Sequence, residues 1–363
     1  MCLVEDIPIG LRTIYHLCGI IQFTCSPNRF TQIISRLLFL PFFLFYGYCC
    51  VKWFIYLILI IRTDFMKFEV VMTLWATFTE ITSMIVFTLR NRKLKTVLLK
   101  LNEIKIKFRF VEKKKLWHDW VKTLTFVTII LQLVLILNVY RTWWSIHLIF
   151  AYIFIPPITC LLNNLFLDNV LQAFYIQFRA INSEIQEISR LSDISFDFTK
   201  FRDLEELSLL HYNLVRLVLE INSLFDVTIL TSMVLWFGNI VSILFIFVES
   251  VLKGILPRMR FRLYLLCLLI HYLLWLFIVV RMYSRTQKEA NQTSVYVHQI
   301  WNQHSEKKYL NEKTRHLQLI SCRLFNTKLF FNAKGFFRLD ETFFHTMIAA
   351  VVTYLIILIQ FRI

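Results

Sequence analysis

Glycine, proline and charge are all scarce in this sequence. Its 363 residues include six Gly and six Pro, and charged residues make up 18% of the chain. This composition excludes collagen-like, disordered and turn-rich β architectures. A cleavable signal peptide, a Cys-x-x-Cys pair, a Gly-rich phosphate loop, a nucleophile elbow and metal-ligand spacing among the nine His are missing too. We therefore expect no cofactor, no metal site and no enzymatic activity.

Apolar residues are correspondingly abundant. Hydrophobic residues make up 57% and aromatic residues 16% of the chain, against about 45 to 50% apolar residues in an average soluble domain. The mean hydropathy is +0.60. A single soluble core stops growing near about 250 to 300 residues, so this excess would leave large apolar patches in water. The composition predicts a bundle of helices in membrane lipid.

Seven apolar stretches are long enough to span a membrane. Each has roughly 20 residues, the length of helix that crosses about 30 Å of hydrocarbon. The stretches are 37–61, 68–89, 124–139, 146–166, 224–248, 261–280 and 343–361.

The basic residues are distributed unevenly between these stretches. The net charge of +16 raises the question of nucleic acid as a partner. However, 31 of the 40 Lys and Arg lie in the N-terminal segment and in the second, fourth and sixth loops, and 7 lie on the opposite side. Short basic loops stay cytoplasmic. We therefore expect no nucleic-acid partner, a cytoplasmic N-terminus and an extracellular C-terminus.

The predicted fold is an all-α membrane protein with seven transmembrane helices and cytoplasmic helical extensions. The predicted units are a cytoplasmic N-terminal segment (1–36), helices 1–4 (37–166), a cytoplasmic helical segment (167–223), helices 5–6 (224–280), a second cytoplasmic segment (281–342) and the last helix (343–363).

Two cytoplasmic segments carry helical patterns of their own. Residues 317–331 are too polar to span a membrane and too apolar to be fully solvated. In the fourth loop, apolar residues at spacings of three and four predict an amphipathic helix that runs into the fifth span. Such helices either pack into a cytoplasmic subdomain or lie on the membrane surface. The apolar positions of the fourth loop are Leu207, Leu210, Leu214, Leu217 and Ile221.

The end of the chain carries the most specific pattern. Residues 353–361 read TYLIILIQF, and residues 335–340, which precede the last helix, read GFFRLD. Both resemble the end of the insect gustatory receptor family, a branch of the insect chemoreceptors. Residues 209–226, LLHYNLVRLVLEINSLFD, resemble the family's approach to the fifth span. In size, span count, orientation and Phe-rich composition, the whole chain resembles members of this family.

This resemblance implies a function. It implies a ligand-gated, cation-permeable channel in the plasma membrane of a sensory neuron, opened by a small tastant. The resemblance also implies a tetramer, whose partners are identical or related subunits. Membrane lipid is the other expected partner, because the spans are apolar. The last helix of each subunit lines the pore, and the cytoplasmic helices form an anchor, here 281–342. Much of the family is thought to serve aversive taste, which favours a bitter compound over a sugar.

The last helix has a polar face. Thr353, Ile357 and Gln360 lie at i, i+4 and i+7, and Tyr354 and Phe361 share the neighbouring stripe. A Gln amide facing lipid would leave its polar groups unpaired. Two interpretations stay open: a hydrogen bond between helices, or a pore in which Ile357 forms a hydrophobic gate and Gln360 hydrates ions.

Two acidic residues precede this helix. Asp340 and Glu341 either attract cations at a cytoplasmic pore mouth or serve as the helix cap and first-turn acid.

Aromatic residues collect in the outer half of the predicted spans, with a few polar neighbours. Rings with few polar groups suit a small ligand, although such rings also pack as core, and those beside Arg141 suit a membrane-interface belt. The candidate ligand-binding residues are Trp75, Tyr140, Tyr152, Trp236, Asn239, Ser242, Tyr264 and His271.

Two other functional classes stay open. A G-protein-coupled receptor would have the reverse orientation and would expose the glycosylation sequon Asn291–Thr293 to the lumen. A transporter would show repeats and broken helices, and the Pro156–Pro157 pair is the one sign of a break. Glu80, within the second span, is interpreted as paired or protonated.

Overall fold

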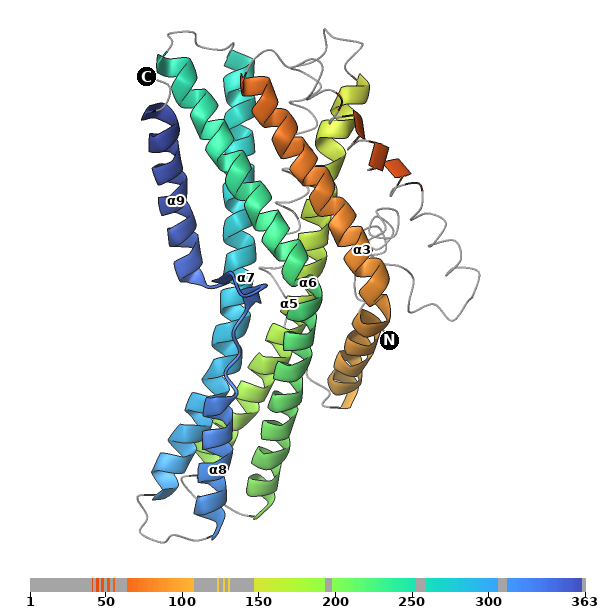
Figure 1. Cartoon of the computed structure of the whole chain (residues 1–363). Coiled ribbons are helices and arrows are strands. Elements are labelled where there is room, and N and C mark those ends of the chain that lie inside the picture. Colours follow the sequence, from red (N-terminus) through yellow and green to blue (C-terminus); the bar gives the residue numbers. More distant parts are fainter. Residues whose placement is uncertain are drawn as a thin grey trace.

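The computed structural model of the chain describes residues 64–107, 147–192, 198–252, 259–305 and 312–360, with isolated residues within 41–55 and 123–130. Four long helices form the body of this part: α3 (Asp64–Lys107), α5 (His147–Ser192), α6 (Phe198–Leu252) and α7 (Met259–Ser305). They lie along one another as a bundle, with α6 antiparallel to the other three (Figure 1).

The helices are longer than a membrane is thick. At about 1.5 Å per residue, the 55 residues of α6 extend over roughly 80 Å, against about 30 Å of hydrocarbon. By contrast, α9 (Glu341–Gln360) has 20 residues, which matches the hydrocarbon alone. We call the end of the bundle beside α9 the α9 end, and the end beside α8 (Glu312–Asn326) the α8 end (Figure 1).

A short β-hairpin joins α8 to α9. Strands β1 (Asn332–Ala333) and β2 (Phe337–Arg338) are antiparallel, with Ala333 opposite Phe337. The turn places Lys334 at φ +53° and Gly335 at φ +82°. A positive φ at two successive residues makes a tight reversal, and Gly carries no Cβ penalty there.

The all-α prediction is confirmed for the described residues, apart from this hairpin. Three described helices are long and apolar enough to cross a membrane: Phe201–Glu249, Leu265–Gln303 and Glu341–Gln360. The apolar stretches 68–89 and 146–166 fall within α3 and α5, except for residue 146. Most residues of stretches 37–61 and 124–139 lie outside the described residues, so the count of seven stays a prediction.

The amphipathic pattern of the fourth loop is confirmed. All five of its predicted apolar positions, from Leu207 to Ile221, are buried. They belong to α6, which continues without a break into the apolar stretch. The second pattern is shorter than predicted: α8 ends at Asn326 and not at Phe331. Beyond it the chain is extended, because Leu329, Phe331 and Ala333 alternate into the core with no exposed surface.

The Pro156–Pro157 pair does not break its helix. α5 runs from His147 through both prolines to Ser192. The described part of α5 therefore does not have the break that the proline pair suggested and that a transporter would show.

A buried amide joins α5 to α7 toward the α8 end. The Asn182 Nδ2 donates to the Glu289 backbone oxygen at 2.8 Å and to Glu289 Oε1 at 2.9 Å. Its Oδ1 accepts from Thr293 Oγ1 at 2.6 Å. Nearby, His211 of α6 lies 2.8 Å from the Ala290 backbone oxygen. Because these groups are away from water, they specify how the three helices align.

We predict that Asn182→Ala lowers the free energy of unfolding by about 2 to 3 kcal/mol, since it leaves buried partners unpaired. Thermal unfolding of the detergent-solubilised chain measures this loss. The matched control is the adjacent, exposed Ser183, whose hydroxyl bonds only to Arg179 of its own helix turn. Ser183→Ala should change stability by less than about 0.5 kcal/mol. Equal effects of the two variants would contradict the account.

Candidate functional site

One exposed line along α9 is polar at three of its four positions. Thr342, Ala349, Thr353 and Gln360 are exposed and lie at i, i+7, i+11 and i+18, on one line along the helix. We call these four residues the α9 line. Val351, on the opposite side, is 3% exposed. Apolar Val352, Ile356 and Ile357 are exposed beside this line, so the outward side of α9 carries a narrow polar stripe between apolar residues.

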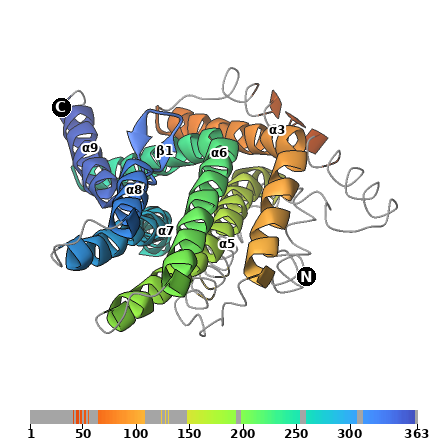
Figure 2. The ribbon, with the colours of Figure 1, turned by 90° about the horizontal axis from the view of Figure 1, so that it is seen from below.

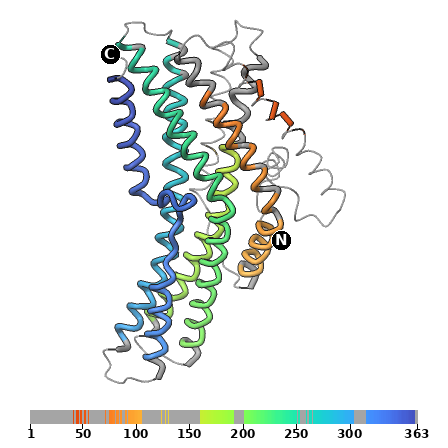
Figure 3. Tube along the Cα trace, in the orientation of Figure 1, coloured from red at the N-terminus to blue at the C-terminus, as the bar shows by residue number. Residues whose placement is uncertain are grey.

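Aromatic contacts hold the other side of α9 to the bundle. The ring of Tyr354 meets Phe237 of α6 edge-on, at 5.6 Å between centroids. The ring of Phe344 meets Phe277 of α7 in the same way at 5.9 Å. α9 therefore stands at the edge of the bundle, against α6 and α7 (Figures 2 and 3).

The predicted pore residues thus divide between two sides of α9. Thr353 and Gln360 belong to the α9 line, and Ile357, 38% exposed, lies beside it. Tyr354 attaches the helix to α6. Phe361 lies outside the described residues.

The two acidic residues have defined partners. Asp340 caps α9: its Oδ1 accepts from the Phe343 backbone N–H at 3.1 Å and from the Thr342 hydroxyl. Glu341 forms an ion pair with Lys288 of α7, 2.7 Å between Oε1 and Nζ. The capping interpretation of Asp340 is confirmed. Glu341 keeps 58% of its side chain exposed, so its charge still faces solvent.

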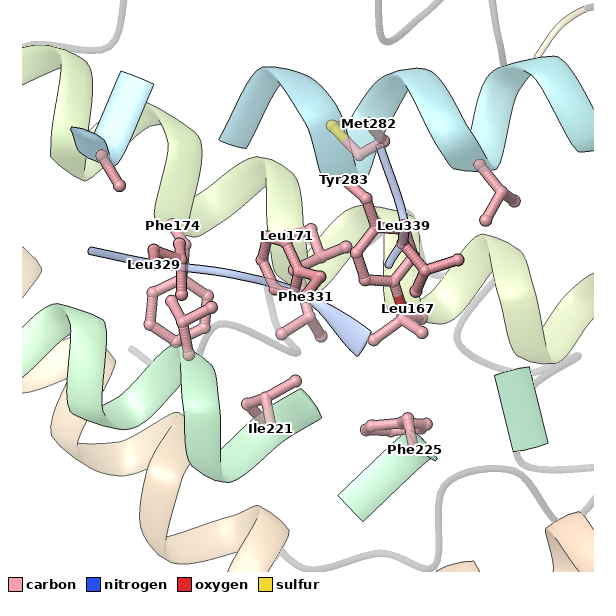
Figure 4. Packing of buried hydrophobic residues seen from close by; sticks show 14 of the residues in the cluster. Leu167, Leu171, Phe174, Ile221, Phe225, Met282, Tyr283, Leu329, Phe331 and Leu339 are labelled. Atoms are coloured by element: carbon pink, nitrogen blue, oxygen red, sulfur yellow. The ribbon is translucent and has the colours of Figure 1, made fainter. Parts of the chain in front are cut away.

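The segment before α9 is held inside the bundle. We call residues 328–340 the lead-in segment. Leu329, Phe331 and Leu339 have no exposed surface, and they pack between α5, α6 and α7 (Figure 4). Phe331 meets Tyr283 of α7 edge-on at 4.8 Å. The base of α9 is therefore continuous with the core of the long helices.

Side-chain amides from α6 and α7 hold the backbone of the lead-in segment. Asn291 donates to the Leu329 backbone oxygen at 3.0 Å and accepts from the Leu329 N–H at 2.8 Å. Asn222 donates to the Asn332 backbone oxygen at 3.1 Å. In a sheet, a neighbouring strand would bond to these backbone groups, and here the two Asn side chains take its place. They fix the position of the segment along α6 and α7.

A separate set of buried polar side chains joins α3, α5 and α6. Cys160 Sγ and Ser232 Oγ are 3.3 Å apart, and Asn164 Nδ2 reaches Ser232 Oγ at 3.3 Å. Trp75 Nε1 donates to the Thr231 backbone oxygen at 3.2 Å. The polar cluster comprises these residues from α3, α5 and α6. Sequence analysis missed Cys160, Asn164 and Ser232, although an Asn within an apolar stretch was a signal.

The structure brings some of the predicted ligand residues to this cluster. Trp75 packs against Cys160. The buried His271 ring of α7 lies edge-on to the ring of its chain neighbour Tyr272. Ser242 and Trp236 are buried farther along α6, and Asn239 bonds back to Leu235 of its own helix. Tyr140 and the side chains of Tyr152, Tyr264 and Glu80 lie outside the described residues.

Sequence comparison matches almost the whole chain to one family. The family described as 7tm Chemosensory receptor matches residues 11–363. The chain is 27% identical to Putative gustatory receptor 28b of Drosophila melanogaster over 192 residues, which are 50% of this chain and 40% of that protein. It is 37% identical to Putative gustatory receptor 28a of the same fly over 94 residues, 26% of this chain and 20% of that protein. The alignments thus span less than half of these relatives.

The fold matches solved insect receptors. The olfactory receptor OR5 from Machilis hrabei in complex with eugenol superposes with a TM-score of 0.69 at 13% identity, covering 98% of this chain and 99% of that chain. A second structure of the same receptor gives a TM-score of 0.66 at 14% identity, covering 97% of this chain and 99% of that chain. At this identity, the likeness establishes the fold alone.

We predict that the sequon Asn291–Thr293 stays unglycosylated. Both polar atoms of the Asn291 amide are bonded to Leu329, and Thr293 has no exposed surface, so an attached glycan could not fit the folded bundle. Digestion with a glycosidase should leave the electrophoretic mobility unchanged. The control is a sequon engineered between residues 253 and 258, the predicted fifth loop. A glycan at Asn291 in folded protein would contradict the prediction.

Proposed function

This chain belongs to the 7tm chemosensory receptor family, and from that premise we propose that it is a gustatory receptor acting as a ligand-gated cation channel. Four subunits, identical or related, form the channel in the plasma membrane of a sensory neuron. A small tastant opens it, and the family favours a bitter compound. The Drosophila relatives carry the gustatory part of this proposal, and the whole-chain family match carries the receptor part.

The observation that supports the pore is the exposed α9 line. The Thr342 and Thr353 hydroxyls bond to Asp340 and to the Ala349 backbone oxygen. A carboxamide in hydrocarbon is costly, and α9 turns that of Gln360 away from its own bundle. If four subunits place this line on a common axis, the polar groups meet water and ions. The aromatic contacts to Phe237 and Phe277 then hold each α9 from behind.

The gate in this proposal is a ring of apolar side chains. Ile356 and Ile357 are 50% and 38% exposed and flank the α9 line one turn before Gln360. Such a ring closes a narrow pore by excluding water, and a small outward displacement of the helices rewets it. Gln360 hydrates ions beside this constriction.

The tastant in this proposal binds beside the polar cluster. Trp75 and His271 supply rings, and Asn164 and Ser232 supply hydrogen-bonding groups from neighbouring helices. Because four helices contribute, a bound molecule shifts their relative positions. Ser232 of the cluster precedes Phe237 by five residues, about 7.5 Å along α6, so such shifts reach the ring contact between Phe237 and Tyr354 of α9 over a short path.

The orientation in this proposal follows the charge count. The α8 end, with most of the basic residues, is cytoplasmic, and Gln360 lies near the extracellular surface. This is opposite to a G-protein-coupled receptor. The unbroken α5 and the absence of internal repeats in the sequence do not favour a transporter.

We predict that Thr353→Cys and Gln360→Cys channels lose cation current when a positively charged, membrane-impermeant thiol reagent is applied outside the cell. The reagent reaches these positions only if the α9 line is wet. The control is Val351→Cys, on the buried side of the same helix, together with the parent chain. Loss of current in the control alone, or in no variant of a conducting channel, would refute the pore assignment.

We further predict that Asp340→Asn with Glu341→Gln lowers the permeability of cations relative to anions. Asn retains the helix cap, so the double variant removes charge without removing the start of α9. Lys288→Gln is the matched control of opposite sign, because it frees Glu341 from its ion pair. Reversal potentials in asymmetric salt measure both effects. Identical reversal potentials in all variants would argue against acidic residues at the pore mouth.

A further inference from the structure

A buried carboxylate connects α3, α6 and the lead-in segment. Asp226 of α6 is 8% exposed. Its Oδ2 lies 3.4 Å from Lys334 Nζ at the hairpin turn, and its Oδ1 lies 3.9 Å from Arg90 Nη1 of α3. A carboxylate in this position holds two cations from two different elements, so it fixes the spacing between them.

Arg90 is attached to α6 by more than charge. Its Nη1 also donates to the backbone oxygens of Ser223 and Leu224, the latter at 3.3 Å. Ser223 and Leu224 precede Asp226 by three and two residues on α6. The guanidinium therefore ties α3 to α6 at the point where the hairpin turn is also held.

The same α3 carries Trp75. Arg90 follows Trp75 by 15 residues, which is about 22 Å along the helix axis. Trp75 bonds to Thr231 of α6 in the polar cluster, and Arg90 bonds to α6 near Asp226. A displacement of α3 against α6 at the first contact must therefore be accommodated at the second.

The lead-in segment continues directly into α9. Lys334 lies six residues before Asp340, the cap of α9, and Leu339 between them has no exposed surface. Lys334 itself holds a positive φ, +53°, which few residues other than Gly adopt without cost. The turn is thus kept in a costly conformation where its ammonium can reach Asp226.

We propose that Asp226 is a positioning residue that couples α3 to the pore helix, holding the lead-in segment and α9 in the closed arrangement until α3 moves. The inference deepens the proposed channel function and rests on it. Arg90 carries the movement of α3 to Asp226, and Lys334 carries it to the base of α9.

The test is a double-mutant cycle of Asp226→Asn and Lys334→Gln in the full-length chain, without any ligand. Basal cation current per receptor at the cell surface is the first readout. Asp226→Asn, which removes the ion pairs with both Lys334 and Arg90, should raise it on the order of tenfold. Lys334→Gln, which removes one of these pairs, should raise it too, and the double variant should raise it no further than Asp226→Asn. Asp226→Glu, which keeps the carboxylate, should restore a low basal current.

Lys328→Gln is the matched control. Lys328 lies on the same segment, but its ammonium sits over the Phe325 ring at 5.5 Å, away from Asp226. This variant should leave the basal current unchanged. Effects that add in the double variant, or an equal effect of Lys328→Gln, would overturn the coupling.

Hydrogen exchange of residues 328–345 in the purified chain is the second readout, and it needs no current. Exchange there should rise in both single variants and rise no further in the double variant. If the parent chain conducts but the exchange and current of the Asp226 and Lys334 variants equal those of the parent, the coupling is wrong and the channel proposal stands. If the parent chain carries no current while exchange follows the cycle, the channel proposal fails and the coupling stands.

Discussion

A polar side chain away from water needs a partner in the protein or a wet path, and this constraint organises the molecule. Asn182 meets it by joining α5 to α7, and Asn291 meets it by holding the backbone of the lead-in segment. On α9, the Thr342 and Thr353 hydroxyls bond to Asp340 and to the Ala349 backbone oxygen, whereas the Gln360 carboxamide is exposed on the outward side of the helix. In the proposed channel, that carboxamide faces a water-filled path between subunits.

The division between long and short helices follows from the same logic. α5, α6 and α7 extend far past the hydrocarbon and pack against one another, and α6 and α7 also pack against α8. α9 has only the length of the membrane, and ring contacts attach one side of it. Because the lead-in segment is part of the core, α9 is rigidly based at one end and lightly held along its length. That arrangement suits a helix that moves when the body rearranges.

Local patterns in the sequence predicted much of this fold and less of the site. Leucines at helical spacing predicted the buried face of α6, and the polar face of α9 followed from Thr353 and Gln360. The end of α8 and the hairpin were missed, because the alternation of Leu329, Phe331 and Ala333 is too short to stand out in apolar sequence. The Cys160–Ser232 contact and the Asp226 bridges were also missed, since they join residues far apart in the chain. Such pairings depend on how helices align, and a single sequence does not encode that in any local pattern.

The central claim is that the α9 lines of several subunits surround a common path for ions. Electron cryomicroscopy of the chain, purified with whatever receptor subunits accompany it, tests this most directly. The account predicts four subunits with Thr342, Thr353 and Gln360 of each α9 facing the central axis. A monomer, or an oligomer in which these residues face lipid, would contradict it.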